Sequence, residues 1–201
     1  MVTLSSSLVL ASASPRRSEI LAALGLPFRV VVSEVLEERA SHEKAIEYTE
    51  RLAAAKATKV ADSISAHEPD AFVLGADTVV VCDNAVLEKP SDDADGVAMI
   101  MRLSGRTHQV ATAFALVHAS RGLLTRSHVV TEVAFRVITQ AEAERYVASG
   151  EGRDKAGGYA VQGRAGGFVV EIRGSYPNIV GLPAREVLDA LLLHGAVLSW
   201  P

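Results

Sequence analysis

Cysteine is almost absent from this chain, because Cys82 is the only one among 201 residues. A single cysteine excludes an internal disulfide, gives no sign of a cysteine-rich metal cluster and suits a reducing compartment such as the cytoplasm. The six histidines are scattered, and no two have the spacing of metal ligands on one helix. We therefore expect a cytoplasmic protein without a disulfide framework.

Long apolar runs and an excess of basic residues are also missing. No stretch reaches the ~18 uninterrupted apolar residues of a membrane span, and residues 1–11 lack the basic start of a signal peptide. The net charge is −4, so no global positive field indicates stable binding to nucleic acid. Hydrophobic residues make up 49% and charged residues 22%, a balance typical of globular proteins. The length suits a single domain over residues 1–201, with room for two lobes.

Strand and helix patterns alternate along the chain. Short apolar runs predict strands at 8–12, 28–32, 72–81, 85–89, 107–117 and 128–138, and two more inside the glycine-rich stretch 154–183. Apolar stripes predict helices at 14–24, 43–64, 91–105, 139–150 and 183–193, with Ser14 and Ser91 as caps and Thr139 with Glu142 as a capping box. Within 128–138, alternation assigns one buried face to Val129, Val133, Phe135 and Val137. Hairpins turning at 83–84 and 121–122 require antiparallel pairs, so the order predicts an α/β fold with a mixed sheet.

Two adjacent arginines stand where the first strand gives way to a helix, in "ASASPRRSEIL". Cations are unfavourable at a helix start, where the macrodipole is positive, so Arg16 and Arg17 suggest that an anion binds there. Backbone N–H groups converge at such a start, Ser12 adds a hydroxyl group, and arginine binds phosphate through two parallel hydrogen bonds. A surface helix with solvated arginines explains this stretch equally well.

Asp77 lies inside the apolar run "VLGADTVVV". A buried carboxylate is costly unless it is paired or binds a cation, so a functional role is favoured over an aspartate at a strand end or at a bulge formed by residues 75–76. With the hairpin turn at 83–84, Lys89 faces Thr78, and a one-residue change in the loop places it opposite Asp77. Either register brings the lysine close to the aspartate. The alternative is a surface ion pair, which stabilises little.

Three further polar residues carry weaker signals. Lys56 borders the apolar face of the expected long helix, and a stem lying along that face with its amine in water explains it best. Glu37 is one of three acids in "LEERASHE", which also suits a solvated acidic loop. Gln162, expected between a strand and a glycine in "YAVQG", offers both a donor and an acceptor, which suits reading the edge of a base.

Six segments together resemble the Maf family of nucleoside triphosphate pyrophosphatases, once described as septum formation inhibitors. They are "LASASPRRSEIL", "LGADTVV", "LEKP", "LSGRTHQVAT", "DKAGGYAVQG" and "VVEIRGSYPNIVGLP". They follow the family order from the first strand to the last helix, so the resemblance covers nearly the whole chain. "GADT" and "YAVQG" are similar to the dTTP/UTP branch rather than the 7-methyl-GTP branch. The chain departs from the family pattern at residues 152–153 and at Pro177.

The resemblance implies an α/β fold with a mixed sheet flanked by helices and two lobes around a deep cleft, similar to inosine triphosphate pyrophosphatases, often as a homodimer. It also implies hydrolysis of the α–β phosphoanhydride of dTTP or UTP, giving the monophosphate and pyrophosphate with Mg²⁺ or Mn²⁺.

The resemblance also assigns roles to the matching positions. Asp77 falls on the position of the proton acceptor, and Lys56 and Lys89 on catalytic positions. Glu37 and Asp77 are candidate metal ligands. The substrate-binding positions are Ser12, Arg16, Arg17, Glu37, Thr78 and Gln162.

Two other functions stay open. One is a non-catalytic regulator of cell division that binds nucleotide or nucleic acid, which the negative net charge and the carboxylate in an apolar run disfavour. The other is a phosphatase that releases single phosphates. The identity of the reaction products separates all three.

Overall fold

A computed structural model describes residues 2–40 and 42–201, and the chain divides into two compact units. The first unit takes Met1–Asp77, Thr112–Val129 and Gly181–Pro201, and the second takes Thr78–Ala111 and Val130–Val180. Three long strands continue from one unit into the other: β4 (Phe72–Cys82), β6 (Thr107–His118) and β7 (Gly122–Phe135).

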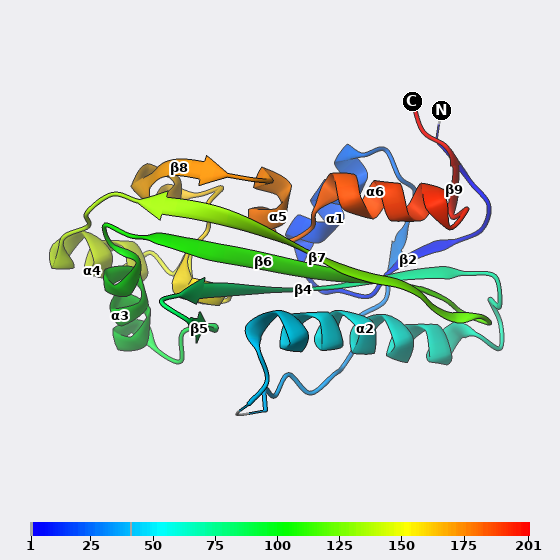
Figure 1. Cartoon of the computed structure of the whole chain (residues 1–201), viewed down its shortest axis with the longest axis horizontal. Helices are drawn as coiled ribbons and strands as arrows, with labels where there is room; N and C mark the ends of the chain where they lie inside the picture. The colour runs from blue at the N-terminus through cyan, green and yellow to red at the C-terminus, as the bar shows by residue number, and fades with distance from the viewer. Residues whose placement is uncertain (1, 41) are drawn as a thin grey trace. The chain divides into compact units, whose positions relative to one another are not determined.

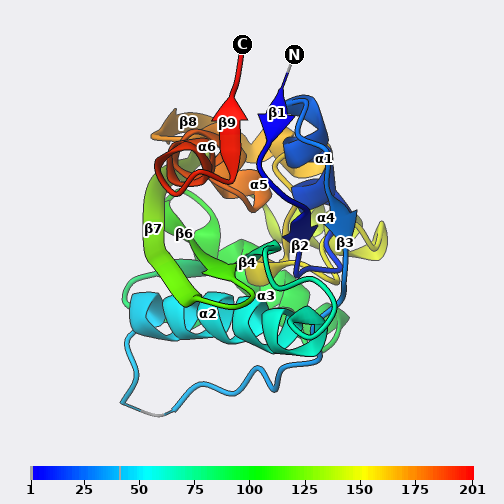
Figure 2. The same ribbon diagram turned by 90° about the vertical axis from the view of Figure 1, so that its right-hand side faces the viewer.

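The first unit is a sheet with helices on both faces. β2 (Leu8–Leu10) pairs in parallel with β3 (Arg29–Val30) and with β4. α2 (Ala45–Ile64) covers one face of this sheet, and α1 (Pro15–Ala23) and α6 (Ala184–Leu193) cover the other (Figures 1 and 2). β1 (Thr3–Leu4) and β9 (Val197–Ser199) form a separate antiparallel pair that no sequence pattern predicts.

The second unit is built on antiparallel pairs. β5 (Ala85–Leu87) folds back onto β4, and β8 (Val169–Arg173) pairs with β7. Its helices are α3 (Asp93–Leu103), α4 (Gln140–Ala148) and α5 (Tyr176–Val180), with the short 3₁₀ turns η1 (Ala156–Gly158) and η2 (Arg164–Phe168). An apolar cluster fixes α3 and α4 against the strands, and it includes Ile100, Leu103, Phe135, Tyr146 and Phe168. With parallel and antiparallel pairs both present, the predicted mixed α/β fold is confirmed.

Local signals in the turns and caps are reliable. Asp83 and Asn84 occupy the predicted hairpin turn with positive φ angles of 49° and 61°, which aspartate and asparagine tolerate better than most residues. The capping box of Thr139 and Glu142 is present at α4. At α3, however, the cap is Asp92 and not Ser91, because the Asp92 carboxylate accepts a hydrogen bond from the Asp95 N–H at 2.8 Å.

Several predicted strands are wrong in length or kind. The strands predicted at 8–12 and 28–32 are shorter in the structure, where they correspond to β2 and β3. The described stretch 154–183 holds one strand, β8, rather than the two predicted. Val137 is 75% exposed instead of buried, because β7 ends at Phe135 and the alternation has no sheet to follow beyond it. Apolar runs show where strands lie but not where pairing stops.

None of the helices in residues 2–40 and 42–201 is both long enough and apolar enough to cross a bilayer.

His108 is buried in the core of the second unit, 2% exposed, and its ring makes edge contacts with the rings of Phe135 and Tyr159. Its Nε2 lies 2.8 Å from the Tyr159 hydroxyl, and its Nδ1 has no hydrogen-bond partner within the described residues. Burial lowers the pKa of His108 to about 4. The imidazole is therefore neutral in the folded protein near pH 7.

We expect the protein to lose stability as the pH falls from 7 towards 4. Across this window the unfolded state binds a proton at His108 that the folded state does not, so protons favour unfolding. This one group contributes up to roughly 3 kcal/mol of the free energy of unfolding, lost by the acidic end of the window. Urea unfolding at pH 7, 6 and 5 measures the slope. His108→Gln should reduce the dependence of the free energy of unfolding on pH, whereas the exposed control His67→Gln should leave it unchanged. If the dependence stayed the same in His108→Gln, His108 would not be its source.

Candidate active site

The turn between β2 and α1 holds Arg17 in a fixed position. Arg17 is 9% exposed, its Nε donates to the Gly181 carbonyl at 2.8 Å, and its NH1 donates to Ser12 Oγ at 2.9 Å. Ser12 Oγ also accepts from the Ser14 N–H at 3.2 Å, which closes the turn. Arg17 is therefore not a solvated surface residue, whereas Arg16 is half-buried.

Burial lowers the pKa of Arg17, and attraction to Asp77 opposes that shift. A guanidinium stays protonated in proteins even so, and Arg17 is a permanent cation. The structure places Ser14 at the N-cap of α1 as predicted, although its hydroxyl makes no capping hydrogen bond in the described chain. The polar atoms at this helix start therefore come from Ser12 and the arginines.

Lys56 joins two carboxylates. It lies on α2, its Nζ is 2.7 Å from Asp77 Oδ1 and 2.5 Å from Glu37 Oε1, and only 9% of its side chain is exposed. The prediction of an amine in water is therefore wrong. Asp77 is 8% exposed in the middle of β4, not at a strand end, and Lys56 supplies the compensating charge that a buried carboxylate requires.

Gly75 allows α2 to approach β4 closely enough for this ion pair. A Cβ atom at Gly75 would lie 2.3 Å from the Ala53 carbonyl oxygen and 2.8 Å from the Ala57 nitrogen, distances that real Cβ atoms do not show. Lys56 stands between these two alanines on the helix, and Asp77 follows Gly75 by two positions on the strand. The glycine thus serves close packing, which a glycine within a strand often marks.

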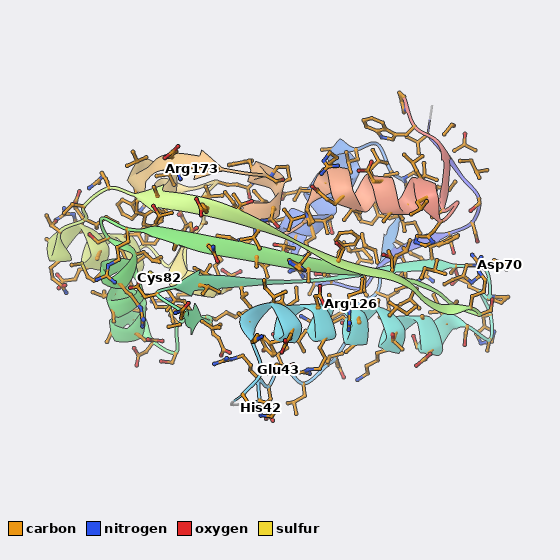
Figure 3. The ribbon with its side chains drawn as sticks, viewed as in Figure 1. His42, Glu43, Asp70, Cys82, Arg126 and Arg173 are labelled. Atoms are coloured by element: carbon orange, nitrogen blue, oxygen red, sulfur yellow. The ribbon has the colours of Figure 1, made fainter. Side chains whose placement is uncertain are left out.

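The segment that carries Glu37 is attached to α2 through its main chain. Tyr48 Oη donates to the Glu37 carbonyl at 3.2 Å, and Arg51 NH2 donates to the Glu38 carbonyl at 2.9 Å. Arg51 also donates to both carboxylate oxygens of Glu43, at 2.7 and 2.8 Å. Figure 3 shows Glu43 below α2. Residues 36–40 are exposed, as the alternative of a solvated acidic loop expects, but the Glu37 carboxylate binds Lys56; residue 41 of this segment is outside the described residues.

Thr78 and Lys89 belong to the second unit. The β4–β5 register pairs Val80 with Leu87, and continuing it places Thr78 level with Lys89, as the turn at 83–84 predicts. Because β5 ends at Leu87, Lys89 follows the strand and is exposed, while Thr78 is half-buried. The lysine that contacts Asp77 within the first unit is Lys56, a pairing that the sequence does not reveal.

Gln162 lies in a turn of the second unit and is exposed. The predicted strand before it is absent from this described stretch, because residues 156–168 form two short 3₁₀ helices joined by turns. Sequence reasoning also missed Glu151 and Tyr146, whose side chains bond the main chain on either side of Gln162. No periodic pattern marks Glu151, which stands between two glycines.

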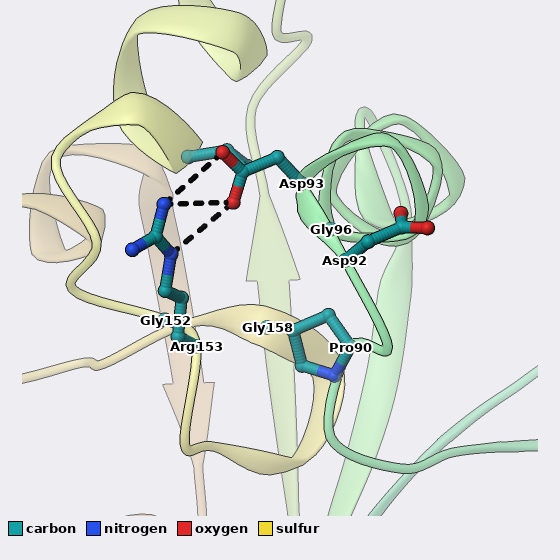
Figure 4. Close-up of a pocket in the computed structure, with 8 residues that line it drawn as sticks. Pro90, Asp92, Asp93, Gly96, Gly152, Arg153 and Gly158 are labelled. Atoms are coloured by element: carbon teal, nitrogen blue, oxygen red, sulfur yellow. Dashed lines mark hydrogen bonds and ion pairs between the residues drawn. The ribbon is translucent and has the colours of Figure 1, made fainter.

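Both departures from the family pattern fit the structure. Arg153 binds the Asp93 carboxylate through Nε and NH2 at 3.0–3.2 Å, which ties the loop to the first turn of α3 (Figure 4). A Cβ atom at Gly152 would lie 1.8 Å from the Gly158 carbonyl oxygen, so only glycine fits there. Pro177 stands in the first turn of α5, where a missing N–H does no harm.

These loop residues line a small pocket in the second unit, which Figure 4 shows: Pro90, Asp92, Asp93, Gly96, Val147, Gly152, Arg153 and Gly158. Its charged groups are already paired or serve as a cap, since Arg153 binds Asp93 and Asp92 caps α3. None of the predicted site residues lines it.

The first unit therefore sets a fixed arginine at a helix start and a buried lysine between two carboxylates on an α/β sheet, features of the class of proteins that handle phosphate-bearing ligands. Residues 7–193 match the family model described as Maf-like protein, and the chain belongs to this family.

The chain is similar to three bacterial proteins named dTTP/UTP pyrophosphatase. It is 45% identical to that of Geobacter sp. (strain M21) over 192 residues, 96% of this chain and 97% of the relative. The identity is 48% over 190 residues for Moorella thermoacetica, covering 94% and 96% of the two chains. It is 48% over 187 residues for Vibrio cholerae, covering 93% and 97%.

Proposed function

We propose that this chain hydrolyses dTTP and UTP at the α–β phosphoanhydride, releasing the nucleoside monophosphate and pyrophosphate. The names of the relatives, which align over nearly the whole chain, support this reading. The structural observation that carries it is the buried Asp77 carboxylate, held by Lys56 Nζ at 2.7 Å. A carboxylate fixed in this way can orient a water molecule and accept its proton.

The cations of the site then act on the phosphates. Arg17 has a fixed guanidinium, and Arg16, on the same helix turn, adds a second one. Lys56 adds a third positive charge in the first unit, most useful where charge develops on the leaving pyrophosphate, and the family resemblance assigns a catalytic role to Lys89. Ser12 provides a hydroxyl group beside Arg17, and the family resemblance assigns Thr78 to substrate binding.

Glu37 and Asp77 fit a divalent cation as a pair. One oxygen of each carboxylate is bound to Lys56 Nζ, at 2.5 and 2.7 Å, so the two groups lie close together and a cation would take their remaining oxygens. The described residues contain no group of three or more His, Cys, Asp or Glu side chains arranged for a metal. Two carboxylates with phosphate oxygens of the substrate are a common ligand set for Mg²⁺. When bound there, Mg²⁺ or Mn²⁺ would lower the pKa of a coordinated water and neutralise phosphate charge.

Product analysis tests the proposed function against its two alternatives. Purified protein is incubated with dTTP and MgCl₂, and nucleotides are separated by ion-exchange chromatography. We expect dTMP, with phosphate detected only after inorganic pyrophosphatase is added. Formation of dTDP and free phosphate would identify a phosphatase instead. Unchanged dTTP with measurable nucleotide binding would identify a non-catalytic regulator.

Gln162→Glu should lower kcat/KM for dTTP and UTP roughly ten-fold, about 1.4 kcal/mol. Thymine and uracil present carbonyl acceptors beside an N–H donor, a pattern that an amide meets and that an acceptor-only carboxylate does not. Steady-state kinetics on dTTP, UTP and 7-methyl-GTP measures the effect. Unchanged relative efficiencies across the three would remove Gln162 from base recognition.

We further propose a cytoplasmic homodimer. The dimer rests on the family resemblance alone, and the compartment on the single cysteine, Cys82, which is buried. Light scattering of the purified protein measures its oligomeric state and so tests the dimer.

A further inference from the structure

The half-buried carboxylate of Glu151 supports the turn that carries Gln162 from its C-terminal side. Glu151 Oε2 accepts a hydrogen bond from the Arg164 N–H at 2.9 Å, and Oε1 accepts one from the Ala165 N–H at 3.4 Å. These two amides open the 3₁₀ turn η2, where they have no carbonyl partner within the turn itself. Glu151 therefore holds the main chain two and three residues after Gln162.

A phenol supports the same turn from its N-terminal side. Tyr146 Oη accepts from the Ala160 N–H at 3.1 Å and donates to Glu151 Oε1 at 3.1 Å. Tyr146 is 4% exposed in the apolar cluster of the second unit, so its position is set by packing on α4. The main chain is thus held two residues before and two residues after Gln162 by one connected pair of side chains.

Gly163 shows how closely this pair approaches the turn. A Cβ atom at Gly163 would lie 2.4 Å from the carboxyl carbon and from one oxygen of Glu151. The carboxylate therefore packs directly against the residue that follows Gln162. Any side chain at this position would displace Glu151 from its hydrogen bonds.

The charges of the pair suit this role. Burial raises the pKa of Glu151, but the hydrogen bonds from Arg164, Ala165 and Tyr146 outweigh it and hold the pKa below its usual range. Burial also raises the pKa of Tyr146, so the phenol keeps the proton that it donates. A charged acceptor with three donors around it fixes geometry more firmly than neutral hydrogen bonds do.

We propose that Glu151 and Tyr146 are positioning residues that set the pyrimidine specificity of the enzyme by fixing Gln162. This inference rests on the proposed function, in which Gln162 reads the base. Gln162 is exposed on its turn, so the side chain owes its direction to the main chain on either side of it. Base recognition by a single amide depends on that direction, because donor and acceptor must both reach their partners.

Glu151→Gln tests the proposal with little change in shape. The new amide nitrogen would face a backbone N–H, so one support of the turn is lost. We expect KM for UTP to rise about ten-fold, the preference for UTP over CTP to fall about ten-fold, and kcat at saturation to stay within about three-fold. Glu144→Gln, at an exposed position on α4, is the matched control and should change none of these values.

Tyr146→Phe gives a second variant that keeps the packed ring and removes only the bridging hydroxyl. It should shift the UTP/CTP preference in the same direction by about three-fold. If either residue only stabilised the fold, its variant would lower the active fraction and reduce the rates on UTP and CTP in proportion. An unchanged UTP/CTP preference in both folded variants would overturn the inference.

A double variant separates this inference from the proposed function. If Glu151 acts through Gln162, then Glu151→Gln in a Gln162→Ala background should change the UTP/CTP preference no further, and an additive change would overturn the proposal. If Gln162→Ala alone leaves the preference unchanged, base reading by Gln162 fails and the inference fails with it. If Gln162→Ala changes the preference and Glu151→Gln does not, only the inference fails.

Discussion

Asp77→Asn should fold as the wild-type protein does and lose about 100-fold or more of its kcat on dTTP. Asparagine keeps the shape of the side chain and its hydrogen-bonding capacity, but it cannot accept a proton from water. Lys56 is not left as an unpaired buried cation, because Glu37 Oε1 remains 2.5 Å from its Nζ. The loss should therefore fall on catalysis rather than on folding, and steady-state kinetics with thermal unfolding of the same sample measures both.

The matched control is Asp70→Asn, an exposed aspartate in the turn before β4 (Figure 3). It makes the same chemical change in the same unit, away from Lys56, and should leave kcat unchanged. If folded Asp77→Asn turned over dTTP within a few-fold of the wild type, Asp77 would not be the proton acceptor.

The sequence predicts the architecture well because periodic patterns and turn residues act locally. The hairpin at Asp83 and Asn84 and the capping box at Thr139 depend on neighbours within four residues, and both are present. The pair of β1 and β9 joins Thr3 to Ser199, and strands this short carry no pattern of their own. Such a pairing depends on tertiary packing, which a local window does not contain.

The sequence names candidate residues for the site but does not show which of them contact one another. Lys56 lies where the helical pattern places it, at the border of the apolar face, and from that position alone an amine in water is the better explanation. What brings it to Asp77 is the contact of α2 with β4 at Gly75, between segments about twenty positions apart in the chain. A glycine inside an apolar strand was the available signal, and it marks the close approach without naming the partner.

Glu151 shows the opposite case, in which neither pattern nor spacing points to the residue. It stands in a loop between two glycines and belongs to no amphipathic stripe. What distinguishes it is that three donors converge on it, two from the main chain after Gln162 and one from Tyr146 on α4. Convergence of this kind exists only in the folded chain.

Arg17→Ala should reduce kcat/KM by about 100-fold or more, and to the same extent for dTTP, UTP and CTP. Arg17 has a guanidinium that is oriented before any ligand arrives, since Ser12 Oγ and the Gly181 carbonyl fix two of its nitrogens at 2.9 and 2.8 Å. Arg16→Ala should lower kcat/KM by less than Arg17→Ala does, because Arg16 is half-buried and its side chain must be ordered when the ligand binds.

Arg17→Lys distinguishes orientation from charge. Lysine keeps the positive charge, but a single ammonium cannot donate to Ser12 Oγ and to the Gly181 carbonyl while also presenting a planar pair of donors to phosphate. We therefore expect Arg17→Lys to recover only a small part of the activity that Arg17→Ala loses. Kinetics on the three nucleotides and thermal unfolding of each variant provide the measurement. Because phosphates are common to all three substrates, a variant that changed the preference between dTTP and CTP while its overall rate stayed intact would show that Arg17 does not bind the phosphates.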